Sequence, residues 1–180
     1  MARIVLGVTG SIAAYKACEL TRLFIKAGDE VRVVMTRAAC EFVTPLTFRT
    51  LSRNPVGVDA FAAPADWRPE HVASADWADL VVVAPATANV IAKMRAGLAD
   101  DLLTGTLLAT RAPIVVAPAM NTGMWENPAT QENIAALKAR GVRFVAPRDA
   151  ELACGVKGVG CLADPADVFA AVRAVVADRG

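Results

Sequence analysis

The sequence of 180 residues is poor in metal ligands, with a single histidine, His71, and four cysteines. Cys18, Cys40, Cys154 and Cys161 form no C-x-x-C pair, so the spacing typical of a zinc site is lacking. We therefore expect no metal. Cysteines without a disulfide pattern also favour a reduced, cytoplasmic protein.

Long apolar runs and an excess of one charge are lacking as well. No run approaches the roughly 18 apolar residues of a membrane helix. Arg3 is followed by only five apolar or small residues before Thr9, too few for a signal peptide. The formal net charge is +1, with both signs scattered along the chain. Without a basic stripe we expect no nucleic-acid partner, and without a long apolar run we expect no membrane partner.

Alanine and valine are abundant in a chain that is 55% apolar and 21% charged. This composition predicts one globular domain over residues 1–180, with a buried parallel sheet and closely packed helices. It also suits an oligomer, because subunit interfaces of that kind resemble a protein core.

Strand-like and helix-like runs alternate along the chain, which predicts an α/β fold. The predicted strands are residues 3–8, 31–35, 80–84, 114–117 and 142–145, and the predicted helices are 12–26, 37–42, 45–51, 70–76, 90–96, 127–140 and 165–176. A further helix is expected to begin near Asp100. Residues 54–69 are expected to form a surface loop, and the glycine-rich residues 147–165 predict a long loop that acts as a movable flap.

The strand at residues 3–8 ends in Thr9-Gly10-Ser11, directly before a helix. Ser11 is a good N-cap, and the backbone N–H groups at such a helix start favour a phosphate. Gly7 and Gly10 do not complete G-x-G-x-x-G, and there is no Walker lysine. The turn predicts a mononucleotide phosphate site, with a plain strand-to-helix turn as the alternative. Thr36, after the second strand, can cap its helix and offer a hydroxyl to a ligand.

Small residues follow the strand at 80–84, in the sequence Pro85-Ala86-Thr87-Ala88-Asn89. The lack of bulky side chains would let a flat ring approach the backbone, although tight packing of helix on strand gives the same pattern. Asp100 and Asp101 could do acid–base chemistry. At a helix start, however, we interpret them as caps that interact with the helix dipole.

The stretch Pro118–Trp125 follows the strand at 114–117, and open α/β sheets bind ligands at the carboxyl ends of their strands. Asn121 supplies an amide donor and acceptor there, and Met120 supplies polarizable apolar surface. The alternative is an ordinary loop whose methionine and tryptophan side chains fill the core. His71 precedes a central strand and is a candidate for proton transfer, although a lone histidine is more often structural.

Several of these segments occur together in one order: Gly10-Ser11-Ile12-Ala13-Ala14, His71, residues 84–89, Pro118–Trp125 and Leu152-Ala153-Cys154-Gly155. In this order and spacing they resemble the homo-oligomeric flavin-containing cysteine decarboxylases. The resemblance covers essentially the whole chain, and its most specific parts are the P-A-M-N-x-x-M-W run and the L-A-C-G segment. It is greatest to the members that act on 4′-phosphopantothenoylcysteine in coenzyme A biosynthesis.

The resemblance implies a Rossmann-like (flavodoxin-like) three-layer sandwich with a central parallel sheet, and FMN as the cofactor. It implies decarboxylation of 4′-phosphopantothenoylcysteine to 4′-phosphopantetheine. In that family the flavin oxidises the thiol carbon, which places the carboxylate β to an electron sink, and CO₂ leaves. The flap cysteine then helps to return the reducing equivalents. Homotrimers, or dodecamers built from trimers, are also implied, with active sites shared between neighbouring subunits.

The resemblance also assigns roles to single residues. Catalytic roles fall on His71, Asn121 and Cys154. The implied FMN site comprises Gly10, Ser11, Ile12, Thr36, Thr87, Ala88, Asn89, Val90 and Ala119, and the implied substrate contacts are Asn121, Met120 and Ala153.

The flap departs from the family pattern at three places. Val156 stands where the family has aspartate, Cys161-Leu162 replace the later pair, and Glu151 occupies a position that is often basic. A carboxylate there is a poor neighbour for an anionic substrate unless Lys157 or Arg148 compensates. The substrate is therefore less firmly implied than the cofactor or the fold.

Two other functions stay open: a peptidyl-cysteine decarboxylase of peptide-antibiotic maturation, and a non-catalytic FMN-binding regulatory subunit. The former needs no reducing flap cysteine, so Cys154 argues against it. A prenyl-flavin synthase ranks lower, because that group lacks the P-A-M-N run. The synthetase domain that follows in many bacterial members is not in this sequence, and we expect a stand-alone decarboxylase.

Overall fold

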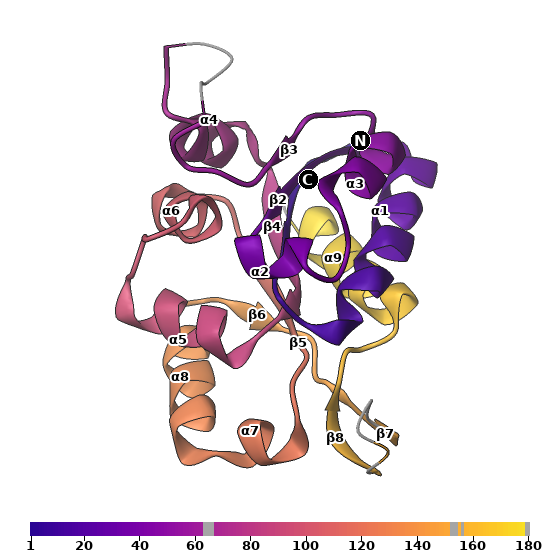
Figure 1. Ribbon diagram of the computed structural model, residues 1–180, viewed down its shortest axis with the longest axis vertical. Coiled ribbons are helices and arrows are strands. Elements are labelled where there is room, and N and C mark those ends of the chain that lie inside the picture. Colours follow the sequence, from indigo (N-terminus) through magenta and orange to yellow (C-terminus); the bar gives the residue numbers. More distant parts are fainter. Residues whose placement is uncertain (63–66, 152–154, 156, 179–180) are drawn as a thin grey trace.

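A six-stranded parallel sheet forms the centre of the computed structural model (Figure 1). Its strands are β1 (Arg3–Val8), β2 (Glu30–Met35), β3 (Val56–Gly57), β4 (Leu80–Ala86), β5 (Ile114–Pro118) and β6 (Arg143–Phe144). Their order across the sheet is β3-β2-β1-β4-β5-β6, the order of a Rossmann fold. The structure describes residues 1–62, 67–151, 155 and 157–178. The predicted Rossmann-like class with a central parallel sheet is confirmed.

Helices cover both faces of this sheet and complete the three layers (Figure 1). One face carries α1 (Lys16–Lys26), α3 (Pro45–Ser52) and α9 (Pro165–Ala177), and the other carries α5 (Ala88–Ala96), α6 (Leu102–Ala109) and α8 (Pro128–Ala139). The remaining helices are α4 (Glu70–Trp77), which packs on α6, and the short η1 (Ile12–Tyr15), α2 (Arg37–Cys40) and α7 (Thr122–Glu126). None of the helices in the described part of the chain is long and apolar enough to cross a membrane.

The central strands are apolar on both sides because helices bury both sides. All seven residues of β4 are buried, and in β1 the side chains of Ile4 and Val5 enter the two opposite cores. A Cβ added at Gly7 of β1 would lie 2.5 Å from Cδ1 of Leu103. The lack of a side chain at Gly7 therefore lets α6 lie close against the sheet.

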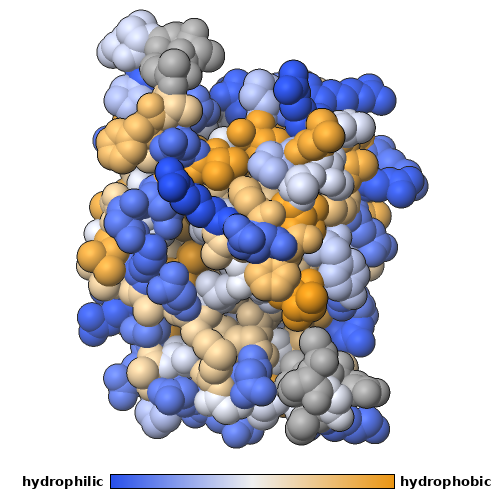
Figure 2. All heavy atoms as spheres, viewed as in Figure 1, coloured by the Kyte–Doolittle hydropathy of each residue, from blue (hydrophilic) through white to orange (hydrophobic). Residues whose placement is uncertain are grey.

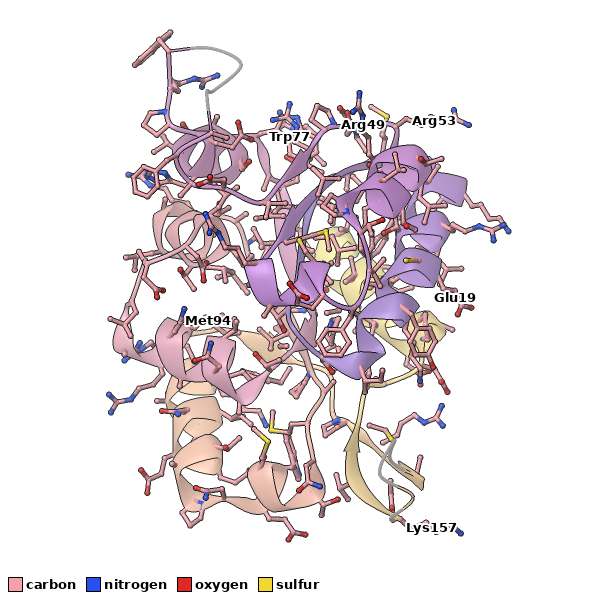
Figure 3. The ribbon with its side chains drawn as sticks, viewed as in Figure 1. Glu19, Arg49, Arg53, Trp77, Met94 and Lys157 are labelled. Atoms are coloured by element: carbon pink, nitrogen blue, oxygen red, sulfur yellow. The ribbon has the colours of Figure 1, made fainter. Side chains whose placement is uncertain are left out.

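Two expectations from the sequence were wrong in their secondary structure. Residues 54–69 contain β3, a two-residue edge strand that pairs with β2 through Val33 and Val56. The stretch 147–165 is not an irregular loop, because it contains the antiparallel hairpin of β7 (Arg148–Glu151) and β8 (Lys157–Cys161). Figure 3 shows Lys157 at the outer end of this hairpin. Movement of the flap stays a prediction.

The glycines of β8 allow close packing against a neighbouring segment. A Cβ at Gly160 would collide with the carbonyl oxygen of Met120, and one at Gly158 would collide with the side chain of Thr122. Glycine therefore lets β8 lie directly against the chain that follows β5. Glycine content had predicted a loop because it signals turns and close backbone approach equally.

The carboxylate of Asp29 gives a test of how the layers are held together. It is fully buried, accepts the N–H of Ala2 at 2.9 Å and pairs with Arg173 Nη1 of α9 at 2.7 Å. We expect Asp29→Ala to lower the free energy of unfolding by about 2 kcal/mol, because a buried N–H and a half-buried guanidinium lose their partner. Arg143→Ala, which breaks an exposed pair with Asp178, should cost less than about 1 kcal/mol. Urea denaturation measures both, and equal losses would contradict this account.

Candidate functional site

The carboxyl ends of β1, β4 and β5 lie side by side where the strand order reverses. Open α/β sheets bind ligands at this position, because the loops diverge there and leave a crevice. β1 leads into residues 10–12, here called the Gly10 turn, and β4 leads into residues 87–90, here called the Thr87 loop. β5 leads into residues 119–121. The sheet thus brings together three segments that are remote in sequence.

The Gly10 turn has the capping geometry that the sequence predicted. The hydroxyl of Ser11 accepts the N–H of Ala13 at 3.2 Å and caps η1. A Cβ at Gly10 would lie 2.6 Å from Cβ of Ala38, so only glycine lets the turn lie this close to α2. Thr36 caps α2 by accepting the N–H of Ala39 at 3.2 Å. Two adjacent helix starts therefore offer backbone N–H groups to an anion.

The Thr87 loop is held from both of its sides. Thr87 caps α5 by accepting the N–H of Val90 at 3.4 Å, and its own N–H donates to Thr9 Oγ1 at 3.0 Å. On the other side, the N–H of Ala119 donates to the carbonyl oxygen of Ala86 at 3.0 Å. These bonds fix the small residues of the loop between the ends of β1 and β5.

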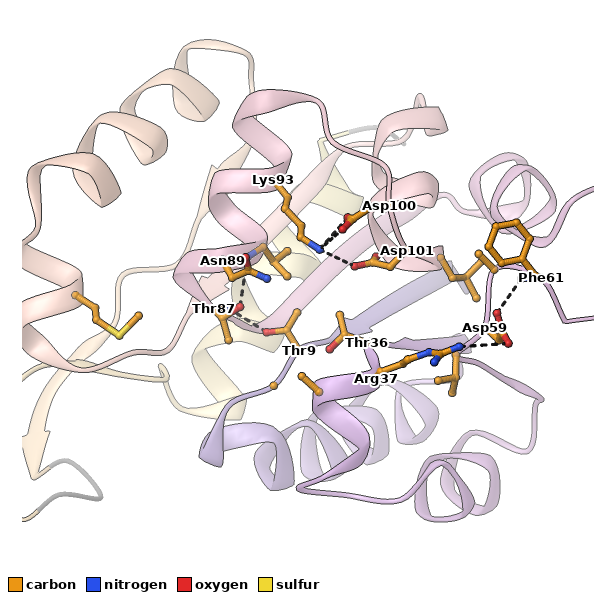
Figure 4. A pocket seen from close by; sticks show the side chains of 17 residues that line it. Thr9, Thr36, Arg37, Asp59, Phe61, Thr87, Asn89, Lys93, Asp100 and Asp101 are labelled. Atoms are coloured by element: carbon orange, nitrogen blue, oxygen red, sulfur yellow. Dashed lines mark hydrogen bonds and ion pairs between the residues drawn. The ribbon is translucent and has the colours of Figure 1, made fainter.

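Two adjoining cavities open at this edge of the sheet and share Gly10, Thr87 and Met124. One, about 670 Å³ in volume and here called the hairpin cavity, also reaches β8. The other, about 630 Å³ and here called the α6 cavity, reaches the start of α6 (Figure 4). Both volumes lie within the range of about 300–1,000 Å³ typical of small-molecule sites.

All nine residues predicted to bind FMN line one cavity or the other. Gly10 and Thr87 line both, Ser11, Ile12, Ala88 and Ala119 line the hairpin cavity, and Thr36, Asn89 and Val90 line the α6 cavity. Backbone donors at one end and small residues at the other suit a ligand with a phosphate and a flat ring. The residues present therefore fit a flavin mononucleotide.

A charged cluster lies on the wall of the α6 cavity (Figure 4). Lys93 Nζ contacts Asp100 at 2.8 Å and Asp101 at 3.3 Å. The hydrogen bond to Asp100 raises the pKa of Lys93, and the same bond lowers the pKa of Asp100. Asp101 caps α6 by accepting the N–H of Thr104 at 2.8 Å. The predicted capping role is thus confirmed for Asp101, whereas Asp100 pairs with Lys93.

Asn121 and Met120, the predicted substrate contacts, both line the hairpin cavity. Asn121 is exposed and caps α7, because its Oδ1 accepts the N–H of Gly123 at 2.8 Å. Within the described residues its amide nitrogen has no partner and is available to donate. The N–H of Met120 donates to the carbonyl oxygen of Gly160 at 3.0 Å, which joins this segment to the hairpin.

Within one chain, His71 lies away from both cavities. It sits on α4 against α6, where a Cβ added at Gly105 would be 3.3 Å from its Cβ. It lines neither cavity, and Figure 1 shows α4 and α7 at opposite ends of the molecule. A single chain therefore does not bring His71 to Asn121. The predicted positions Cys154 and Ala153 lie outside the described residues.

The sequence assigned no binding role to several other residues that line the cavities. These are Ala13, Tyr15, Lys16 and Gly160 in the hairpin cavity, and Thr9, Arg37, Asp59, Phe61 and Lys93 in the α6 cavity. Lys16 could have been found from its position one turn after Ser11. Lys93 and Asp59 had no local signal, since α5 and the chain after β3 bring them to the site only in the folded protein. Nowhere in the described chain do three or more histidine, cysteine, aspartate or glutamate residues form a group that could hold a metal ion.

Comparison with known proteins gives close relatives over nearly the whole chain. The Coenzyme A biosynthesis bifunctional protein CoaBC of Bacillus subtilis (strain 168) is 50% identical over 165 residues, 92% of this chain and 41% of that protein. The chain therefore spans about two-fifths of the length of this relative.

Solved structures of related proteins share the fold. A PPC decarboxylase mutant complexed with pantothenoylaminoethenethiol is 33% identical, with a TM-score of 0.88 and 98% of each chain covered. SpaF, an FMN-dependent cysteine decarboxylase, is 32% identical, with a TM-score of 0.86 and coverage of 100% of this chain and 98% of SpaF. The resemblance noted from the sequence is confirmed. Residues 1–177 match the family described as Flavoprotein, and the chain belongs to that family.

Proposed function

We propose that the chain is an FMN-dependent decarboxylase that converts 4′-phosphopantothenoylcysteine to 4′-phosphopantetheine in coenzyme A biosynthesis. The observation that carries this proposal is the convergence of the predicted FMN residues and Asn121 on two adjoining cavities. The relatives support it, since one is named for coenzyme A biosynthesis and another is a PPC decarboxylase.

The cofactor would be held by the Gly10 turn and the Thr87 loop. Backbone N–H groups of the turn, with the hydroxyls of Ser11 and Thr36 beside them, suit the phosphate. Ala88 and Ala119 leave room for the ring. FMN would supply the two-electron oxidation of the cysteinyl thiol carbon, which places the carboxylate β to an electron sink.

Asn121 is suited to hold the substrate carboxylate. Its Oδ1 is already occupied by the N–H of Gly123, which fixes the orientation of the amide and leaves the Nδ2 donor for a carboxylate oxygen. A neutral donor binds the carboxylate without neutralising it fully. The carboxylate therefore keeps its negative charge. When CO₂ departs, the electron pair of the bond that breaks passes to the rest of the substrate.

The position of His71 supports active sites that are shared between subunits. Because His71 and Asn121 lie far apart in one chain, both can act on one substrate only if neighbouring copies supply them. Apolar side chains near α4 suit such an interface, since Phe61 is 95% and Trp67 is 88% exposed. Figure 2 also shows apolar residues gathered over α3 and β3 on the face drawn. We propose a homotrimer, or a dodecamer built from trimers.

A peptidyl-cysteine decarboxylase is the second candidate, because EpiD, a protein of that name, shares the fold with a TM-score of 0.80 at 23% identity. The higher identity to CoaBC and the presence of Cys154 favour the small-molecule substrate. A regulatory FMN-binding subunit without activity is the third, and release of CO₂ from the proposed substrate would exclude it.

The first prediction for this function concerns the chromophore. The purified protein should be yellow and, after denaturation, should release FMN with about one flavin per chain, because the site offers donors for one phosphate. Mass spectrometry of the released compound and the absorbance of the supernatant give identity and stoichiometry. Release of FAD or NAD, or no flavin after saturation with FMN, would contradict the cofactor assignment.

The second prediction concerns shared sites. His71→Asn and Asn121→Asp should each be inactive, the latter because a carboxylate at position 121 repels the substrate carboxylate. After subunit exchange of equal amounts, about a quarter of the sites combine an intact His71 with an intact Asn121 and should regain activity, as random mixing across a cyclic interface predicts.

CO₂ release measures the recovered activity, and native mass spectrometry verifies the exchange. The same two proteins mixed without exchange serve as the control. Verified exchange with no gain over the parent proteins, or a monomer in light scattering, would contradict shared sites.

The third prediction separates the two decarboxylase functions and concerns Cys154. Cys154→Ser should still bind FMN and release CO₂ once, because its thiol is needed only to return a proton late in the reaction. The flavin should then stay bleached, and the product should be the oxidised enethiol.

Flavin absorbance and product mass after one turnover are the measurements. Cys18→Ser, a change at a half-buried cysteine of α1, is the matched control and should give the reduced product. Reduced product at the wild-type rate from Cys154→Ser would favour the peptide-modifying function.

A further inference from the structure

The side chain of Thr9 connects the two segments that we propose to hold FMN. Thr9 follows β1 directly, is fully buried and lines the α6 cavity. Its hydroxyl donates to the carbonyl oxygen of Pro85 at 2.7 Å and accepts the N–H of Thr87 at 3.0 Å. Figure 4 shows Thr9 and Thr87 side by side on the cavity wall.

These two bonds occur where the backbone ladder between β1 and β4 has ended. The last paired residues of these strands are Gly7 and Val83. Other junctions at this edge are made by backbone groups alone: Thr36 N–H donates to Val8 at 3.0 Å, and Ala119 N–H donates to Ala86 at 3.0 Å. Backbone bonds form with any residue except proline as donor. The junction of β1 with β4 differs, because it depends on a side-chain hydroxyl.

We propose that Thr9 is a positioning residue that sets the distance between the Gly10 turn and the Thr87 loop. This inference rests on the proposed function, in which the turn holds the phosphate and the loop faces the ring. A ligand that contacts both segments binds best when their separation is fixed before it arrives. Thr9 touches neither the reacting atoms nor the substrate in this proposal, and acts through the segments on either side.

Valine is the informative substitution, because it has the shape of threonine without the hydroxyl. Thr9→Val leaves the buried carbonyl of Pro85 and the N–H of Thr87 without their partner, and the Thr87 loop loses its fixed position. We expect the apoprotein to bind FMN about tenfold more weakly, the usual consequence of losing a buried hydrogen bond. Riboflavin lacks the phosphate and does not contact both segments, so its affinity should fall by a smaller factor than that of FMN.

Quenching of flavin fluorescence during titration of the apoprotein gives both dissociation constants. Thr9→Ser keeps the hydroxyl and should bind both flavins close to wild type. Thr21→Val is the matched control, because Thr21 is equally buried and its hydroxyl donates to Ala17 within α1 at 2.8 Å, away from the cavities. It should leave the affinity for both flavins unchanged.

Wild-type affinity of Thr9→Val for both flavins would overturn the inference, as would a loss of affinity for riboflavin as large as the loss for FMN. If Thr9→Val does not fold, Thr9→Cys replaces it, because a thiol is a weaker hydrogen-bonding group than a hydroxyl. Equal affinities of the serine and cysteine variants would then overturn it. Failure of the wild-type apoprotein to bind FMN would instead contradict the proposed function itself.

Discussion

The parallel pairing of β1 with β4 is the constraint on which the rest of the site depends. Their register, from Ile4 with Leu80 to Gly7 with Val83, brings the carboxyl ends of both strands to the same level. Because helices cover both faces, the strands carry apolar side chains nearly throughout, and polar groups are confined to the edge of the sheet. The Gly10 turn and the Thr87 loop are therefore neighbours as a direct result of strand order, although almost eighty residues separate them.

Two different physical devices close the site around this edge. On the α6 side, ion pairs and caps define the wall, and Lys93 joins the end of α5 to the start of α6 through two carboxylates. On the hairpin side, close backbone contact defines the wall. The carbonyl oxygen of Gly160 accepts the N–H of Met120 with no side chain between the two segments. Glycine in β8 thus shapes a cavity wall. A high frequency of glycine in a sequence therefore indicates close backbone packing as much as it indicates a mobile loop.

Local signals were accurate where a structure depends on a few consecutive residues. Ser11, Thr36 and Asp101 cap their helices as expected, because an N-cap bond reaches only two or three residues along the chain. The hairpin at β7 and β8 and the edge strand β3 were missed, since strand pairing depends on a partner that a short segment does not specify. The place of Asn121 in its loop was predicted, whereas its second use as the cap of α7 was not.

By itself, the sequence determined the α/β class and the main helices and strands, and its resemblance to a known family indicated nine of the residues that line the two cavities. Periodicity, capping residues and glycine turns carry the information on the fold, and they act over a few residues. Only the tertiary structure decided that Thr9 bonds to Pro85 and Thr87, that Lys93 faces Asp100, and that His71 lies far from Asn121. These residue positions result from the order of the strands and the packing of the helices on the sheet. Both depend on many contacts between distant segments, which a local sequence pattern does not specify.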